Sequence, residues 1–158
     1  MIQRIQSIYL GIVIVLLSIV SVGVELFSFI GENSRFTFSS YGITEYSLET
    51  GKVIGTQFFP MFIGLIALVL LSFLCLMAYK NLNRQFKLGR MVFYLYFVAV
   101  VAVILLANFG NRMIEAETHS REMGLGFILF VCGFPFTFLA NTGIKRDKKL
   151  LDSLDRLR

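Results

Sequence analysis

The chain ends in two adjoining stretches, FILFVCGFPFTFLANTGI (residues 127–144) and KRDKKLLDSLDRLR (residues 145–158), and the boundary between them decides how it folds. The first belongs to an uncharged run from 123 to 144, and a helix of about 20 apolar residues crosses the hydrocarbon core of a bilayer. The second is strongly basic, and lysine and arginine collect in short cytoplasmic segments. The boundary therefore predicts a transmembrane helix whose C-terminal side faces the cytoplasm.

Three further uncharged runs, 5–24, 53–79 and 91–111, are as long as a membrane span. Hydrophobic residues make up 56% of the chain and charged residues only 16%, whereas a soluble domain has about 25% charged residues. We therefore expect an all-α membrane protein, an antiparallel bundle of four transmembrane helices within a single membrane domain, residues 1–158. The predicted helices cover about 7–30, 57–79, 90–110 and 125–144.

The basic residues predict the orientation of this bundle. With both termini in the cytoplasm, 11 of the 15 lysine and arginine residues lie on the inner side, as short cytoplasmic loops require. The net charge of +5 then divides into +8 inside and −3 outside. Such a basic inner rim predicts contact with anionic lipid headgroups rather than with nucleic acid.

The two outer loops have different patterns. Within the first, 31–56, polar and apolar residues alternate after Arg35 and a turn is expected at Thr50-Gly51, which predicts a small β-hairpin or three-stranded sheet. Within the second, Glu115, His119 and Glu122 have the spacing of one helix face. A single imidazole beside water favours a solvated helix face, and we expect no metal.

A candidate polar pocket near the outer leaflet comprises Glu25, Asn108, Asn111 and Arg112. Glu25 ends a stripe of mostly small residues on the first predicted helix, which begins at Ser7 and is expected to face the bundle. An acid inside a membrane is a functional candidate by default. The alternative is an interfacial carboxylate that pairs with Arg112 or Arg35. No nucleophile–base set and no phosphate-binding glycine loop is present in the sequence, so we expect no enzyme and no cofactor.

Small residues recur on the helices and predict close packing between them. Examples are Gly64 and Ala67 in the second predicted helix, and Ala99 and Ala102 in the third.

The tail, 145–158, reads as an amphipathic helix with leucines on one side. It can lie on the inner leaflet or extend the fourth helix into the cytoplasm and bind a partner. The candidate contacts to lipid headgroups or to a partner are Lys145, Arg146, Lys148, Lys149, Leu150, Leu154, Arg156, Leu157 and Arg158.

Both ends of the chain resemble the domain-of-unknown-function family 4293, small four-helix membrane proteins of Bacteroidota. The N-terminal match is MIQRIQSIYL (residues 1–10), and the C-terminal match comprises Leu139-Ala140-Asn141, Ile144, Lys145, Asp147, Leu150, Ser153 and Asp155-Arg156-Leu157-Arg158. The chain departs from the family pattern at Thr142, Lys148 and Asp152. The resemblance implies a multi-pass protein of a Gram-negative inner membrane and implies no activity.

Sparse polar chemistry and several packing stripes together predict a non-enzymatic accessory or scaffold subunit of a membrane complex. The alternative is a small transporter, or a membrane protein that binds a lipid or small molecule in the polar pocket. A buried Glu25 beside a sizeable cavity would favour that alternative.

Overall fold

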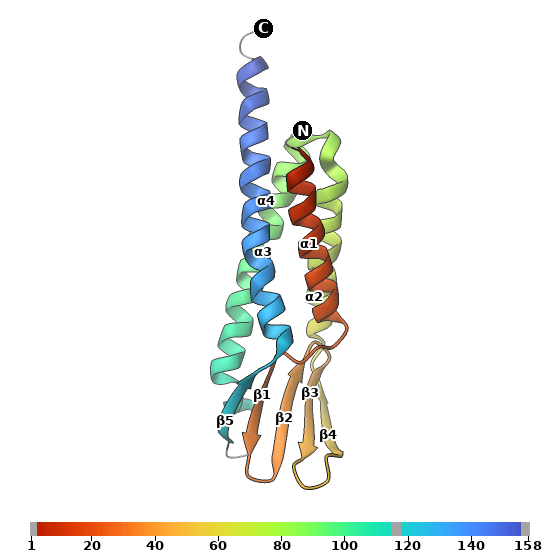
Figure 1. Ribbon diagram of the computed structural model, residues 1–158, viewed down its shortest axis with the longest axis vertical. Coiled ribbons are helices and arrows are strands. Elements are labelled where there is room, and N and C mark those ends of the chain that lie inside the picture. Colours follow the sequence, from red (N-terminus) through yellow and green to blue (C-terminus); the bar gives the residue numbers. More distant parts are fainter. Residues whose placement is uncertain (1–2, 115–117, 156–158) are drawn as a thin grey trace.

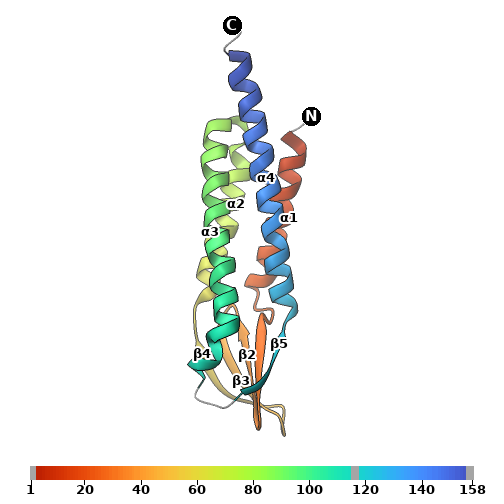
Figure 2. The same ribbon diagram turned by 90° about the vertical axis from the view of Figure 1, so that its left-hand side faces the viewer.

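The computed structural model describes residues 3–114 and 118–155. Within these residues, the helices α1 to α4 lie side by side in an elongated bundle, and a β-sheet continues the bundle at one end (Figures 1 and 2). In chain order the helices and strands are α1 (Gln3–Ser21), β1 (Phe27–Gly31), β2 (Ser34–Ser39), β3 (Gly42–Ser47), β4 (Val53–Phe58), α2 (Met61–Met77), the 3-10 turn η1 (Ala78–Lys80), α3 (Leu82–Phe109), the 3-10 turn η2 (Gly110–Met113), β5 (Thr118–Met123) and α4 (Leu125–Asp155).

The sheet corrects the predicted fold class, because the protein is not an all-α bundle with a small hairpin. Five antiparallel strands occur in the order β4-β3-β2-β1-β5. The first predicted helix, 7–30, was too long, because α1 ends at Ser21 and residues 27–31 form β1. Gly23 turns the chain between them with φ of 102°, a conformation that favours glycine. The apolar residues of β1 thus pack in a sheet instead of lining a membrane helix.

The second outer loop also differs from the prediction. Thr118–Met123 form strand β5 and pair with β1, with Ser28 opposite Glu122 and Phe29 opposite Arg121. Side chains alternate between the two faces of a strand, so His119 and Glu122 cannot share a helix face. Glu115 lies outside the described residues. The spacing of three polar residues carries no information about the partner strand β1, which lies about 90 residues earlier in the chain. A helix was therefore predicted from the spacing alone.

Within the described residues, three helices are long and apolar enough to cross a membrane: Met61–Lys80, Leu82–Phe109 and Leu125–Leu150. The apolar part of α1, Ile5–Ser21, is shorter. The prediction of four equivalent spans was therefore wrong by this measure, although α1 packs within the same bundle. The start of α1 and the end of α4 both lie at the end opposite the sheet, and α4 extends past the other helices there (Figure 1).

The buried face of α1 consists of Gln6, Leu10, Val13, Leu17 and Val20. The small-residue stripe that was predicted to face the bundle lies beside this face and is only half-buried. Between α3 and α4, Tyr96 and Gly133 make a close contact. The Tyr96 hydroxyl donates to the Phe130 carbonyl oxygen at 2.7 Å, and a methyl group added at Gly133 would lie 2.2 Å from that hydroxyl oxygen. Glycine at 133 therefore permits the crossing of the two helices.

Candidate functional site

The sheet has an aromatic face that packs against the helices. Phe27 lies opposite Phe38 and Phe29 lies opposite Phe36 in the register of β1 and β2. All four rings are buried. A Cβ at Gly110, where α3 ends, would lie 3.3 Å from the Phe29 ring. This apolar layer fixes the sheet on the end of α3.

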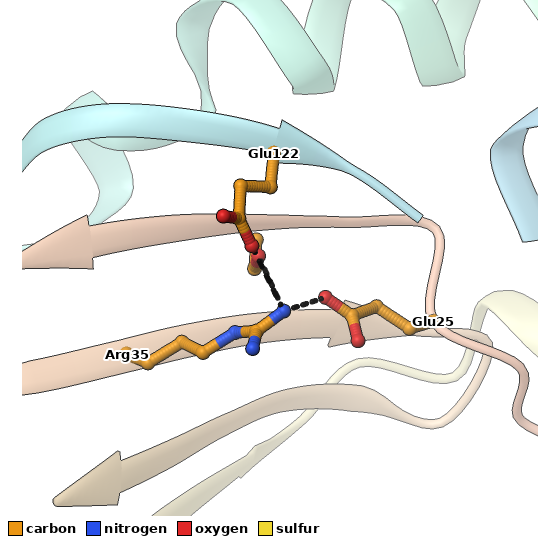
Figure 3. A network of polar contacts seen from close by, with 4 residues as sticks. Glu25, Arg35 and Glu122 are labelled. Carbon is orange, nitrogen blue, oxygen red and sulfur yellow. Dashed lines mark hydrogen bonds and ion pairs between the residues drawn. The ribbon is translucent and has the colours of Figure 1, made fainter. Parts of the chain in front are cut away.

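The opposite face of the sheet carries a charged cluster. Arg35 Nη2 lies 2.9 Å from Glu25 Oε1 and 3.2 Å from Glu122 Oε2, and it also donates to the Ser28 hydroxyl at 3.2 Å. Figure 3 shows the two carboxylates converging on the guanidinium from β5 and from the linker before β1. Because Arg35 and Glu25 side chains are 37% and 33% exposed, solvent limits such a pair to at most about 1 kcal/mol of stability.

A pocket of about 380 Å³ opens beside this cluster and is lined by Glu25, Arg35, Thr37, Tyr46, Ser47, Leu48 and Gly51. Two carboxylates, Glu25 and Glu122, surround one guanidinium, so the cluster has a net negative charge. Hydroxyl and charged groups line the pocket, and such groups can hydrogen-bond a polar ligand.

The structure brings Glu25 together with Arg35, one of its two predicted partners, and not with Asn108. The Asn108 amide donates to the Ile104 carbonyl oxygen at 2.8 Å, and its oxygen accepts from Arg121 at 2.9 Å. Arg121 and Glu122 are neighbours in β5 and point to opposite faces, so the sheet separates Asn108 from Glu25.

Two other predicted pocket residues, Asn111 and Arg112, lie in the turn η2 at the end of α3. Asn111 is exposed, and the Arg112 side chain lies outside the described part of the structure. Arg35 was considered only as a partner of Glu25, and Glu122 was assigned to a helix face. The strand-like alternation around Arg35 could have indicated that this residue lies on one face of a sheet. Glu122 could not be placed beside it without knowing that residues 118–123 form the strand β5.

The strand β4 forms one edge of the sheet and is markedly apolar. It contains no charged residue, and Val53, Ile54 and Phe58 are 54%, 60% and 73% exposed. The opposite edge, β5, contains His119, Arg121 and Glu122. The two edges of the same sheet therefore differ in chemical character.

A groove continues from β4 along the bundle. One hollow of about 260 Å³ lies between the sheet and α3, and another of about 380 Å³ lies between α2 and α3. They share Phe59, Met61 and Leu106, so we name both together the α2–α3 groove. Small residues from both helices line its second part: Gly64, Ala67, Ala99 and Ala102. These residues were predicted to pack helices together. Ala99 does pack against the core, whereas Gly64, Ala67 and Ala102 are exposed and leave an open apolar surface.

The basic tail continues α4 as one helix to Asp155, without a break at the boundary between Ile144 and Lys145. Lys145, Arg146, Lys149 and Leu150 are exposed. Lys148 instead places its ammonium group 5.0 Å from the centre of the Phe86 ring of α3, a cation–π contact. The Leu154 side chain and residues 156–158, which include Arg156, Leu157 and Arg158, lie outside the described part.

Among the described residues, no group of three or more His, Cys, Asp or Glu side chains is placed to hold a metal ion. An apolar helical bundle with three candidate spans defines the chain as a membrane protein. It belongs to the DUF4293 family, a domain of unknown function, whose sequence model matches residues 2–157. This confirms the resemblance seen at the two ends of the chain. No curated protein matches the sequence.

Proposed function

We propose that this protein is a non-enzymatic accessory or scaffold subunit that binds another membrane protein through β4 and the α2–α3 groove. The observation that carries the proposal is the uncharged, apolar and exposed edge strand β4. Soluble β-proteins protect an exposed edge with charges, proline or bulges, because an open edge pairs with other strands. The β5 edge has such charges. The strand β4 contains neither a charged residue nor a proline, and its one irregularity is the register shift opposite Tyr46 of β3.

The partner that fits is a membrane protein with an extended segment next to a transmembrane helix. Strand addition to β4 would satisfy the backbone groups that β4 directs away from β3. The groove that begins at Phe59 is lined by glycine and alanine farther along, and small residues allow a second helix backbone to approach closely in lipid. One partner chain can therefore occupy both surfaces.

We propose further that the protein resides in the inner membrane with both termini in the cytoplasm and the sheet outside. The terminal segments lie at the same end of the bundle (Figure 1), and exposed Lys145, Arg146 and Lys149 lie at that end. The positive-inside rule supports this orientation. In it, the exposed basic residues of α4 meet anionic headgroups of the inner leaflet.

A photo-crosslinking amino acid placed in living cells at Ile54 of β4 or at Ala102 of the groove tests the proposal. We expect the same membrane protein to be captured from both positions. The matched control is Ser120, which is exposed on β5 and should capture no such protein. Products containing only lipid, or equal capture from Ser120, would contradict it. Products of twice the chain mass would show a homodimer instead of a complex with another protein.

A second candidate function is the binding of a small polar molecule or a lipid headgroup in the pocket beside Glu25. The pocket of about 380 Å³ with Arg35 and Tyr46 in its wall supports this function. The net negative charge of the cluster favours a cationic or amine-bearing ligand. Ligand screening by thermal shift, with Glu25→Gln as the comparison, distinguishes the two functions, because crosslinking at Ile54 should not depend on Glu25.

A further inference from the structure

A buried polar layer crosses the bundle near the end opposite the sheet. Gln6 of α1, Gln85 of α3 and Asp147 of α4 are 2%, 2% and 8% exposed. Gln6 Nε2 donates a hydrogen bond to Asp147 Oδ2. From α2, the Cys75 thiol donates to the Gln85 carbonyl oxygen at 3.6 Å. All four helices therefore contribute to this layer.

Two glycines bring these helices close together. A Cβ at Gly89 of α3 would lie 3.2 Å from Ile144 Cδ1 and 3.4 Å from Asn141 Oδ1, both in α4. A Cβ at Gly143 would lie 2.8 Å from Gln6 Cγ. Since α3 and α4 run in opposite directions (Figure 1), Gln85, one turn before Gly89, lies level with Asp147, three residues after Ile144.

The layer contains more oxygen acceptors than donors to satisfy them. Five buried side-chain oxygen atoms among the described residues have no hydrogen-bond partner: Gln6 Oε1, Ser72 Oγ, Gln85 Oε1, Asn141 Oδ1 and Asp147 Oδ1. An unsatisfied buried acceptor costs about 1–3 kcal/mol, so buried polar groups are nearly always satisfied. Three of these oxygens, on Gln6, Gln85 and Asp147, belong to side chains of the layer that are at most 8% exposed, so the layer has acceptors to offer to a further group.

The Asp147 carboxylate also has no ion-pair partner among the described residues. Its neighbour Lys148 lies over the Phe86 ring instead. Buried charges in proteins are paired or bind a metal ion, so a cation is the partner that this carboxylate would accept.

We propose that this layer binds a monovalent alkali cation between Asp147 Oδ1 and the amide oxygens of Gln6 and Gln85. Carboxylate and amide oxygens are the hard ligands that such cations prefer. One carboxylate balances one positive charge, whereas a divalent ion would leave the apolar bundle with an excess charge. The inference is independent of the proposed docking function, because the layer and β4 lie at opposite ends of the molecule.

The test uses the full-length protein in detergent micelles, with Cys132→Ser as the background so that only buried Cys75 reacts with a fluorogenic maleimide on unfolding. Thermal unfolding is measured in sodium, potassium or choline chloride at constant ionic strength and pH. A cation present at ten times its dissociation constant raises the unfolding temperature by about 3–6 °C. We expect that rise to saturate for sodium or potassium and to be absent in choline.

Asp147→Asn should abolish the saturable rise, whereas Glu49→Gln, at an exposed position, should keep it and thereby control for the loss of one negative charge. Binding of radioactive sodium or rubidium to the purified protein gives a second measurement that needs no variant, with saturation near one ion per chain expected. Equal unfolding temperatures in all three salts, a rise that persists in Asp147→Asn, or no saturable ion binding would overturn the proposal.

Discussion

Replacing Gly133 with alanine tests the contact at which α3 and α4 cross. The added methyl group would lie 2.2 Å from the Tyr96 hydroxyl oxygen, far inside van der Waals contact. Tyr96 is fully buried and cannot move without losing its bond to the Phe130 carbonyl oxygen. Overpacking costs about 1–3 kcal/mol and the lost hydrogen bond about 1 kcal/mol. The helix propensity of alanine returns about 1 kcal/mol, so we expect a net destabilisation of about 1–3 kcal/mol.

A double-mutant cycle separates this clash from a general effect of the substitution. Tyr96→Phe removes the hydroxyl oxygen, and the next nearest atom, Tyr96 Cζ, would lie 3.3 Å from the new methyl group. Gly133→Ala should therefore cost much less in the Tyr96→Phe background, giving a coupling of about 1–2 kcal/mol.

The measurement is unfolding followed by circular dichroism in detergent, and the control is Gly11→Ala. A Cβ at Gly11 meets nothing within 4 Å, so that variant should be neutral or slightly stabilised. Additive effects of the two substitutions, or equal effects of Gly133→Ala and Gly11→Ala, would refute the reasoning.

Four other substitutions test the sheet. Gly42→Ala should unpair β3 from β4, because φ is +146° and the new Cβ would lie 2.1 Å from a β4 carbonyl oxygen. Amide hydrogen exchange should then show that the amides of β3 and β4 have lost their protection. Gly51→Ala, at φ +65° in open space, should cost only about 1 kcal/mol, measured by thermal unfolding. Arg35→Gln should destabilise by less than about 1 kcal/mol, with a difference from wild type that shrinks at high salt; a larger, salt-independent loss would contradict a solvent-screened pair. Phe29→Ala should cost about 3–5 kcal/mol, and an unchanged unfolding temperature would exclude its ring as an anchor of the sheet.

The helices could be predicted from charge-free runs, because a helix in lipid needs only length and apolarity. The end of α1 could not. Phe27–Ile30 are apolar, and an apolar segment satisfies both a membrane helix and a buried strand. Gly23, which turns the chain after α1, is the local sign that the helix ends. Pairing with β2 and β5 makes the following segment a strand. These residues were thus correctly identified as apolar, but their secondary structure was predicted wrongly.

The candidate site was predictable only in part for the same reason. Pairing of Glu25 with Arg35 was one of two alternatives, and Arg35 lies ten residues from Glu25 in the chain. Glu122 reaches Arg35 because β5 pairs with β1, and no local sequence pattern predicts that pairing. The small residues Gly64 and Ala102 were identified, but their side of the helix was not, because burial depends on which neighbouring helices are present.

The position of β5 imposes an order on biosynthesis. Strands β1 to β4 lie in one continuous segment, Phe27–Phe58, which is synthesised before α3 and β5. The fifth strand follows α3, so β1 keeps one open edge until the polypeptide has been synthesised to Met123. Contacts between segments so distant in the chain form late, and an open strand edge is a site for wrong pairing. Attachment of β5 therefore completes the sheet and, through Gly124 packed against the Glu25 carbonyl, starts α4 in its place.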